Sequence, residues 1–407
     1  MTAIVAAAIA VRITVMATGL GRLEDPDRYL ILARSLADGE GFCFHGRPTA
    51  YRPPLYPILL APIVRSITPA GWPWGVGALH LALGVGTVLM TYRAARGLGL
   101  SGGRSLAASA IVALDPVLVF QSRSVMTETP AGFLIAASLA ALTVSGPRGP
   151  MLGGFVLGLA GLCRPSLLAP AALVVMTSIL ARPGRARVRF RRGLLIGVSI
   201  LVTLAPWAWR NARVFGEPIW TTTHGGYTLA LGNNPVYYAE VLDGPAGSVW
   251  SGPNQARWFR DMTRSVAGMS EPESDRKLRD SGLAMLRERP LTFFRASVAR
   301  LGRFWGVAPS GAVYPGGIRL ATALWTVPLW IAMVLGLIRP PIWNWPGIAA
   351  PSMVIALTIV HLAYWTDLRM RAPILPAIAL IAAGAWAGNP RIEQVGRSDL
   401  IDNRRLE

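Results

Sequence analysis

Charged side chains are scarce in this chain. They make up 15% of its 407 residues, whereas soluble domains carry roughly 25%. Hydrophobic residues reach 52%, and the mean hydropathy is +0.43. This composition argues against a water-soluble globular protein and predicts a protein that crosses a membrane several times.

The residues that build metal and nucleotide sites are also few. Cys43 lies in a polar loop and Cys163 in a Gly-rich apolar run, which argues against a disulfide framework and against a Cys-based metal site. No glycine loop of the nucleotide-binding type occurs, so neither ATP nor a soluble nucleotide sugar is predicted as a cofactor. The four histidines lack the spacing of zinc ligands: His45, His80, His224 and His361.

Lysine is nearly absent, because Lys277 is the only one among 40 basic residues. The basic residues outnumber 21 acidic ones and give a net charge of +19. They lie between apolar runs rather than along one amphipathic face, so they are not typical of nucleic-acid binding. We interpret them as signals of membrane topology and as partners for phosphate.

Apolar runs predict an all-α bundle of about ten transmembrane helices. The first run contains Arg12 and has no basic residues before it, which favours a spanning helix over a cleaved signal peptide. The predicted spans are 3–20, 72–92, 105–121, 129–145, 150–163, 165–181, 193–209, 320–338, 345–365 and 372–388.

Arginines in the short connections set the predicted orientation. Three of them, Arg93, Arg96 and Arg104, follow the second span, and six lie in 182–192 before the seventh. Because basic short loops face the cytoplasm, ten spans that start inside place the polar segments of chemical interest outside. These external segments are the stretch after the first span, 122–128, Arg164, 210–319 and 366–371.

The segment 210–319 is the only long hydrophilic stretch and predicts an external subdomain. We expect helix over 274–307, including an amphipathic helix at the membrane interface, although 291–307 could instead dip into the bilayer. The predicted organisation is a transmembrane module in 1–209 with its first external loop at 21–71, the subdomain 210–319, C-terminal spans in 320–388 and a cytoplasmic tail in 389–407.

Three acids follow the first span in the sequence EDPDRY: Glu24, Asp25 and Asp27. A helical repeat of apolar residues begins at Tyr29 and would lie along the membrane surface. A carboxylate there, partly shielded from water, is suited to take a proton from an incoming hydroxyl. Asp25 is the predicted base; capping of the helix is the alternative for both aspartates and is favoured for Asp27.

The motif YRPPLYP (51–57) stands in the same loop. Its two adjacent prolines stiffen the chain and so fix the direction of Tyr51 and Arg52. Arg52 is predicted to bind a phosphate through two hydrogen bonds. The alternative is that it anchors the loop to lipid headgroups.

Two further acids lie close to or within predicted spans. Glu128 opens the fourth span on the external side, where it would orient the nucleophile or complete a divalent-ion site with Asp25, unless it only caps the helix. Asp115 lies inside the third span, where an ionisable group needs a partner. Arg12 is the expected partner, and a kink at the Asp-Pro pair is the alternative.

Other arginines stand at the outer ends of predicted spans. Together they could neutralise a phosphate leaving group without a metal ion; singly, each could be a side chain that reaches from the bilayer to its surface. They are Arg164, Arg210, Arg369 and Arg371. The predicted phosphate-binding set is Tyr51, Arg52, Arg164, Arg210 and Arg371.

Five stretches, taken in order, resemble the landmarks of the GT-C membrane glycosyltransferases. They are DPDRYLILARSLADGEGF with the loop that follows it up to YRPPLYPILLAP, then TETPAGFL, GLCRPSLLAP, APWAWRNARVFGEPIWTTTHGGYTLALGNNP and DLRMRAPILPAIAL. The resemblance covers residues 10 to 388 and is nearest to the bacterial branch related to protein O-mannosyltransferases and aminoarabinose lipid A transferases.

The resemblance implies a sugar donor linked to polyprenyl phosphate and an active site at the outer face of the bacterial cytoplasmic membrane. It implies that Asp25 acts at the acceptor, that Arg52 is the basic residue before the double proline, and that Glu128 is the acid of the second external loop. Relatives often carry two adjacent acids followed by paired tyrosines. The spread acids of this chain and its single Tyr29 therefore keep Asp27 as a rival for the base.

The expected function is inverting transfer of a hexosyl or pentosyl group to a protein, lipid or glycan acceptor that the sequence does not identify. No metal site is predicted, and the sequence does not decide whether a divalent cation takes part. One alternative is a flippase for lipid-linked sugars, which would need access from both faces and usually has paired repeats that the sequence lacks. Another is a ligase that takes a glycan from a lipid diphosphate.

Overall fold

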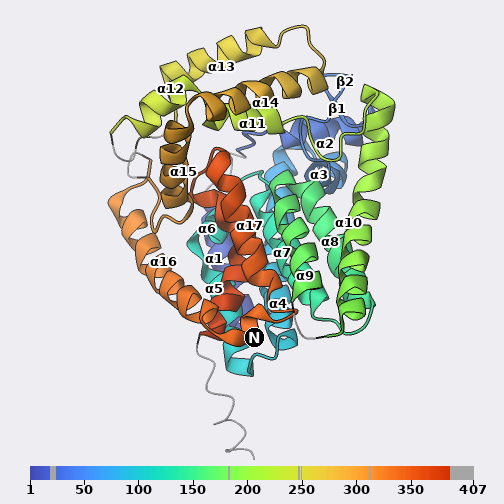
Figure 1. Ribbon diagram of the computed structural model, residues 1–407, viewed down its shortest axis with the longest axis vertical. Coiled ribbons are helices and arrows are strands. Elements are labelled where there is room, and N and C mark those ends of the chain that lie inside the picture. Colours follow the sequence, from blue (N-terminus) through green and yellow to red (C-terminus); the bar gives the residue numbers. More distant parts are fainter. Residues whose placement is uncertain (19–23, 182–183, 246–247, 249, 311–312, 386–407) are drawn as a thin grey trace, which may run out of the picture.

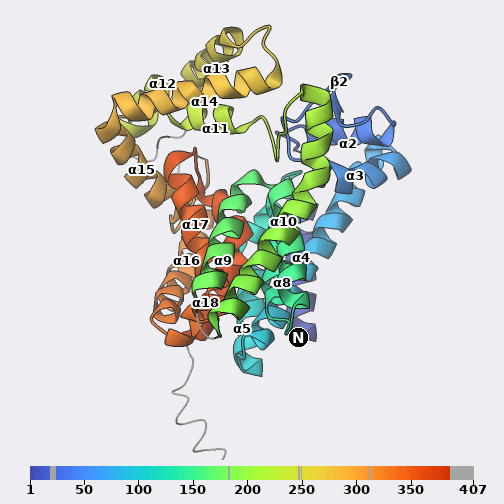
Figure 2. The ribbon, with the colours of Figure 1, turned by 45° about the vertical axis from the view of Figure 1, so that its right-hand side comes forward.

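The computed structural model describes residues 1–18, 24–181, 184–245, 248, 250–310 and 313–385. Regular structure in these residues is helical except for one hairpin, whose strands have two residues each. The helices form a bundle and a cap across one end of it (Figures 1 and 2). The all-α prediction is confirmed, and the predicted tail 389–407 lies outside the described residues.

The bundle contains a helix in each of the ten predicted spans. Its helices are α1 (Thr2–Ala17), α4 (Trp72–Gly97), α5 (Gly102–Leu114), α6 (Pro116–Gln121), α7 (Glu128–Leu142), α8 (Arg148–Cys163), α9 (Leu168–Leu180), α10 (Ala186–Phe215), α16 (Gly316–Leu337), α17 (Ala349–Ala363) and α18 (Leu375–Gly384).

Three helical segments in the described part of the chain are long and apolar enough to cross a bilayer unaided: Pro69–Gly97, α10 and α16. Seven further apolar helices have only 10 to 17 residues. A spanning helix needs about 20 residues, so the exact number of crossings stays a prediction. The long apolar helices and the apolar bundle make this a multi-pass membrane protein.

The third predicted span is two helices, α5 and α6, which meet at Asp115. Its carboxylate accepts hydrogen bonds from the backbone N–H groups of Val117 and Leu118, both 3.0 Å, and so caps α6. Arg12 binds the carbonyl oxygens of Val112 and Ala113 at the end of α5, at 3.3 and 2.8 Å. The expected ion pair is therefore replaced by the kink: Asp115 caps one helix and Arg12 satisfies the carbonyls freed from the other.

The cap has two parts that lie side by side at the same end of the bundle (Figure 2). One part comes from the first external loop and comprises α2 (Tyr29–Ala37), the hairpin β1 (Cys43–Phe44) and β2 (Arg47–Pro48), and α3 (Leu55–Ser66). The other comprises α11 (Gly225–Gly232), α12 (Pro235–Tyr237), α13 (Pro253–Ser265), α14 (Glu271–Glu288) and α15 (Pro290–Phe304). The sequence predicted helix in 274–307, but not the apolar helix α3.

α15 packs against α17 on one side. Its opposite side exposes apolar residues at helical spacing: Leu291, Phe294 and Val298 are 79%, 67% and 55% accessible. This pattern is that of an amphipathic helix at a membrane interface.

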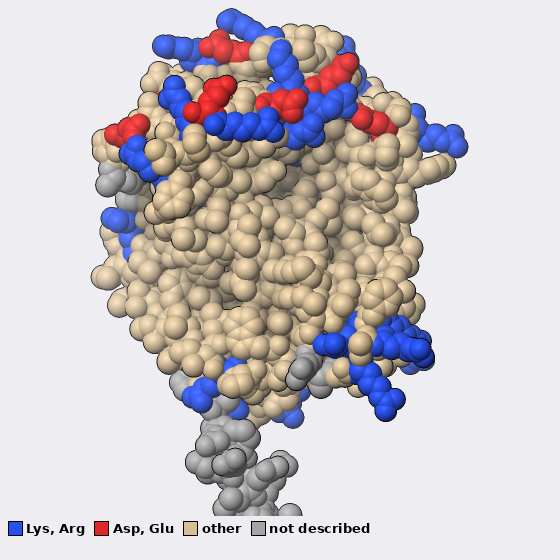
Figure 3. Space-filling model, in the orientation of Figure 1, with Lys and Arg blue, Asp and Glu red and all other residues tan. Residues whose placement is uncertain are grey.

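The two ends of the molecule differ in charge. On the face shown in Figure 3, the cap carries both signs, a band without charged side chains follows, and the far end carries arginines without Asp or Glu. The start of α10 supplies arginines to that far end: Arg187, Arg189, Arg191 and Arg192. An arginine-rich end is the one expected to face the cytoplasm.

Candidate active site

A cavity of about 1200 Å³ lies between the cap and the bundle. Its wall is built from the first external loop, the start of α7, the turn between α8 and α9, the segment that leads into α11, one side of α13, and the chain from the end of α17 to Met370. Figure 3 shows the surface hollowed below the charged cap. Segments far apart in the sequence thus meet around one space.

Asp25 and Asp27 play different structural parts. Both carboxylate oxygens of Asp25 accept backbone hydrogen bonds at 2.8 Å, from Tyr29 and Leu30, and so hold the start of α2. Burial raises the pKa of Asp25, although these hydrogen bonds act in the opposite direction. Asp27 lines the cavity, whereas Asp25 does not. The capping that the sequence favoured for Asp27 thus belongs to Asp25.

Arg52 is held in place by Asp27. Its Nη2 donates to Asp27 Oδ1 at 2.9 Å and its Nε to the Asp27 carbonyl at 3.2 Å. The double proline positions it, because Pro54 is the N-cap of α3 and fixes where the loop ends. Both side chains line the cavity.

His224 joins the same group from the N-cap of α11. Arg52 Nη1 lies 3.3 Å from His224 Nε2. Since the guanidinium can only donate, Nε2 is the acceptor and the ring proton is on Nδ1. Burial and the charge of Arg52 lower the pKa of His224 well below its ordinary value. Tyr51 packs edge-on against this ring at 4.4 Å, and burial raises the pKa of the Tyr51 phenol.

Glu128 is completely buried at the start of α7. Its Oε1 lies 3.1 Å from Arg164 Nη1 and 4.0 Å from Arg369 Nε, and neither carboxylate oxygen has a hydrogen bond among the described residues. Arg369 also pairs with Asp367 at 3.3 Å. Arg164 is extended before Pro165, which ends α8 and lets its side chain reach the cavity.

Two predicted phosphate ligands lie outside the cavity. Arg210 donates to the carbonyl oxygens of Thr49 and Phe42 at 2.8 and 2.9 Å. Arg371 is 1% exposed and donates to the carbonyl oxygens of Phe304 and Gly306 at 2.8 and 2.6 Å. Neither lines the cavity. Each donates to two backbone carbonyls, and the structure thus keeps both apart from the predicted ligands that line the cavity.

The cavity also includes residues that the sequence did not single out as ligands. His361 is 5% exposed, lines the cavity at the end of α17, and has no hydrogen-bond partner for either ring nitrogen among the described residues. Arg369 lines it too, although the sequence placed it only among the outer cations. Glu271, Gln255 and Phe259 enter from the second part of the cap. A single histidine in an apolar run, such as His361, does not indicate from sequence that its side chain lines a cavity.

Glu271 ties the two parts of the cap together at the edge of the cavity. Its carboxylate accepts from Thr49 Oγ1 at 2.6 Å, from the Ala50 backbone at 2.9 Å and from Thr223 Oγ1 at 3.0 Å. The position of the loop that carries Arg52 therefore depends on the start of α14. Within the described residues, no group of three or more His, Cys, Asp or Glu side chains has the geometry to hold a metal ion.

The profile of the dolichyl-phosphate-mannose-protein mannosyltransferase family matches residues 63–180. That match includes Glu128 and Arg164 and leaves out nearly all of both parts of the cap. A search of curated proteins found no match.

Solved structures of the Archaeoglobus fulgidus oligosaccharyltransferase share the fold. One, tethered to an acceptor peptide with the NVT sequon, is 14% identical over 100% of this chain and 50% of its own, with a TM-score of 0.56. Another, of the same enzyme (AglB) with an inhibitory peptide and a dolichol-phosphate, is 12% identical over 100% and 51%, also with a TM-score of 0.56. The chain spans about half the length of these proteins.

A structure of ArnT from Cupriavidus metallidurans bound to undecaprenyl phosphate is 14% identical and aligns over 93% of this chain and 76% of its own. Its TM-score is 0.42. The oligosaccharyltransferase structures suffice to show a membrane bundle of the GT-C type.

Proposed function

We propose that this protein is an integral membrane glycosyltransferase that moves a sugar from a polyprenyl-phosphate donor to an acceptor at the outer face of the membrane. One observation carries the proposal. A single cavity where the bundle meets the cap gathers the carboxylates of Asp27 and Glu128 with the guanidiniums of Arg52, Arg164 and Arg369. The family profile and the GT-C fold support it, because those proteins act on or bind lipid phosphates.

The charge of the two ends supports the outer location. The end opposite the cap is rich in arginine, and such an end faces the cytoplasm. The cap and the cavity then face the exterior. A water-soluble acceptor can reach the cavity from that side, while apolar lining residues such as Leu231 and Val360 accommodate the start of the lipid chain.

Asp27 is the proposed base. Arg52 occupies its Oδ1, whereas Oδ2 has no hydrogen bond within the described part of the chain. Oδ2 takes the proton of an acceptor hydroxyl as that oxygen attacks the anomeric carbon. The bond from that carbon to the phosphate oxygen breaks on the opposite side, and the configuration of the sugar inverts.

The guanidiniums of Arg164 and Arg369 are the proposed partners of the departing phosphate. Glu128 holds Arg164 and Asp367 holds Arg369, so both are oriented before the ligand arrives. Beside protein, where the effective dielectric constant is lower than in bulk water, such contacts stabilise developing negative charge more strongly. They replace Arg210 and Arg371 in the phosphate-binding set.

The test compares two aspartates that are two residues apart. Detergent-purified protein receives radiolabelled polyprenyl-phosphate mannose, glucose or arabinose, together with envelope material from cells that lack the protein. We expect Asp27→Asn to lower transfer by about 10²- to 10⁴-fold, the range for loss of a general base.

The matched control is Asp25→Asn. It weakens a helix cap, at about 1 kcal/mol of stability, and should retain most transfer in the protein that folds. Ordinary transfer by Asp27→Asn, or a larger loss in folded Asp25→Asn, would remove Asp27 from the role of base.

A further inference from the structure

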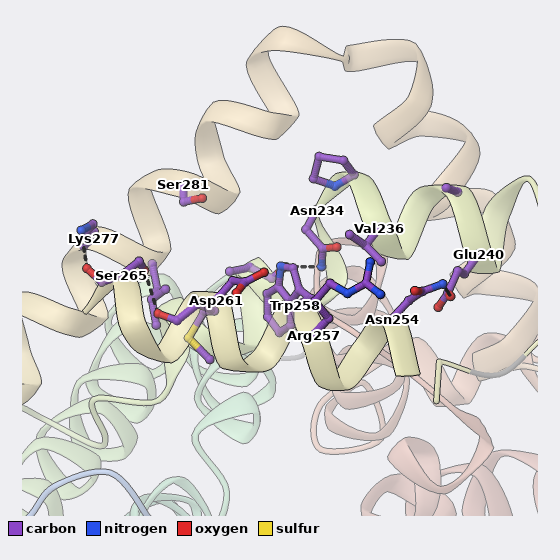
Figure 4. A pocket seen from close by; sticks show the side chains of 15 residues that line it. Asn234, Val236, Glu240, Asn254, Arg257, Trp258, Asp261, Ser265, Lys277 and Ser281 are labelled. Carbon is purple, nitrogen blue, oxygen red and sulfur yellow. Dashed lines mark hydrogen bonds between the residues drawn. The ribbon is translucent and has the colours of Figure 1, made fainter. Parts of the chain in front are cut away.

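A second cleft, of about 750 Å³, lies within the cap and away from the cavity described above. It is bounded by α13 on one side and by α12 and α14 on the other. Figure 4 shows Trp258 in its middle, between Asp261 and Arg257. Asn254 and Glu240 lie at one end of the cleft, and Ser265 and Lys277 lie at the other.

α13 separates this cleft from the cavity. Gln255 and Phe259, four residues apart and so on one helical face, line the cavity. Asn254, Trp258 and Met262 repeat with the same spacing on the other face and line the cleft. The helix thus presents one side to each space.

An aromatic wall connects the two spaces. The Trp258 ring lies 6.4 Å from the Tyr227 ring and 6.0 Å from the Trp250 ring. Both Tyr227 and Trp250 line the cavity, and Trp258 lines the cleft. A ligand resting on Trp258 is therefore one aromatic ring away from the site of the proposed chemistry.

The polar groups around Trp258 suit a neutral ligand that carries hydroxyl groups. Two basic side chains, Arg257 and Lys277, are balanced by two acidic ones, Glu240 and Asp261. A phosphate or another anion would need an excess of positive charge, which the cleft lacks. Arg257 makes no hydrogen bond or ion pair within the described residues, so its donors are available to a ligand.

Sugars fit this combination. One face of a pyranose or furanose ring presents C–H groups that pack on an aromatic ring, while its hydroxyls point outward and bond to amide, carboxylate and guanidinium groups. An apolar lipid would offer no acceptor to the Arg257 guanidinium. The aromatic surface with polar groups around it is also typical of pockets for small polar ligands.

We propose that this cleft binds a saccharide, and that the saccharide is the acceptor of the transfer reaction or part of it. The role of this saccharide as acceptor rests on the proposed function, whereas saccharide binding in the cleft does not. A glycan chain held on Trp258 extends past α13 and places its terminal hydroxyl in the cavity near Asp27.

The experiment measures binding to the full-length protein in detergent. The probes are linear oligosaccharides of mannose, galactose, arabinose and N-acetylglucosamine, observed by saturation-transfer NMR. At least one should bind with millimolar affinity or better. Trp258→Ala should weaken it about tenfold, which corresponds to about 1.4 kcal/mol, and Trp258→Phe should restore most of the loss.

Two further variants separate this proposal from the proposed function. Trp209→Ala, on the exposed side of α10 (64% accessible), is the matched control and should bind like the wild type. Asp27→Asn should bind oligosaccharide normally although it does not transfer sugar. If no oligosaccharide binds the wild type at millimolar concentration, or if Trp258→Ala binds equally well, the cleft is not a saccharide site; the transfer result stands unaffected. Binding of peptides but not sugars would also overturn the proposal.

Discussion

Two pairs of arginines at the cap end of the bundle differ in what they bind. Arg164 and Arg369 meet carboxylates at 3.1 and 3.3 Å and line the cavity. Arg210 and Arg371 each bind two backbone carbonyls and lie outside it. All four follow or precede apolar runs on the same side, and the sequence proposed the same role for three of them.

The difference lies in the partner. A guanidinium bound to two carbonyls supplies hydrogen bonds inside the fold. Its loss leaves those buried acceptors without donors. A guanidinium paired with a carboxylate at a cavity wall keeps other N–H groups for a ligand. We therefore expect the carbonyl-bound pair to determine stability and the carboxylate-bound pair to determine chemistry.

The largest expected effect is that of Arg371→Ala on folding. It removes a fully buried side chain that spans two carbonyls and stacks on Trp330 at 4.7 Å. We expect a loss of about 3 kcal/mol or more, seen as a small monodisperse fraction in size-exclusion chromatography. Arg371→Ala with normal yield and normal thermal unfolding, but no transfer, would reverse the assignment.

Arg369→Gln should show the opposite behaviour. Its side chain is 31% exposed, so the fold can tolerate the change. We expect transfer to fall about 10²-fold, the loss seen when one preorganised donor is removed from a developing negative charge. The measurement is kcat with a polyprenyl-phosphate sugar, at an unfolding temperature close to that of the wild type. Unchanged kcat would place the phosphate elsewhere.

Arg210→Ala should be intermediate. It frees the loop between β2 and Tyr51 from α10, and we expect a stability loss of about 1 to 3 kcal/mol. Any fall in transfer should follow from the displaced loop and be relieved at lower temperature. Arg213→Ala is the control and should change little, because Arg213 is an exposed neighbour whose guanidinium lies 5.0 Å from the centre of the Trp209 ring.

The smallest expected effect concerns pH. His224 has a lowered pKa and stays neutral in the fold, while the unfolded chain binds a proton below its ordinary pKa of about 6.5. Stability is therefore lost as the pH falls, by at most about 1.4 kcal/mol per pH unit. The unfolding temperature should drop more between pH 7.5 and 5.5 in the wild type than in His224→Gln. Equal drops would show that His224 is protonated in the folded protein.

Much of the bundle could be predicted from hydrophobic length. All ten predicted segments contain helices, because an apolar run inside a bilayer must satisfy its backbone hydrogen bonds within the segment. The kink at Asp115 and helix α3 were harder to predict from the sequence. The first depends on Arg12 from another helix, and the second follows a polar loop that reads as one external segment.

The site could be predicted in part. The first loop, Arg52, Glu128 and Arg164 do meet in one cavity, because the segments that carry them all end at the same side of the bundle. The choice between Asp25 and Asp27 depended on which carboxylate faces the backbone of α2. The choice among the arginines depended on which of them lie beside backbone carbonyls. Neither choice could be made from the neighbouring sequence, because both depend on contacts formed in the fold. The place of His361 in the cavity wall became visible only in the folded structure.

The account can be tested most directly by determining the structure of the protein with undecaprenyl phosphate in detergent or nanodiscs. The phosphate is predicted to lie within hydrogen-bonding distance of the Arg164 or Arg369 guanidinium, on the same side of the bundle as Asp27. A phosphate found at Arg210 or Arg371, or at the arginine-rich end of α10, would contradict the account.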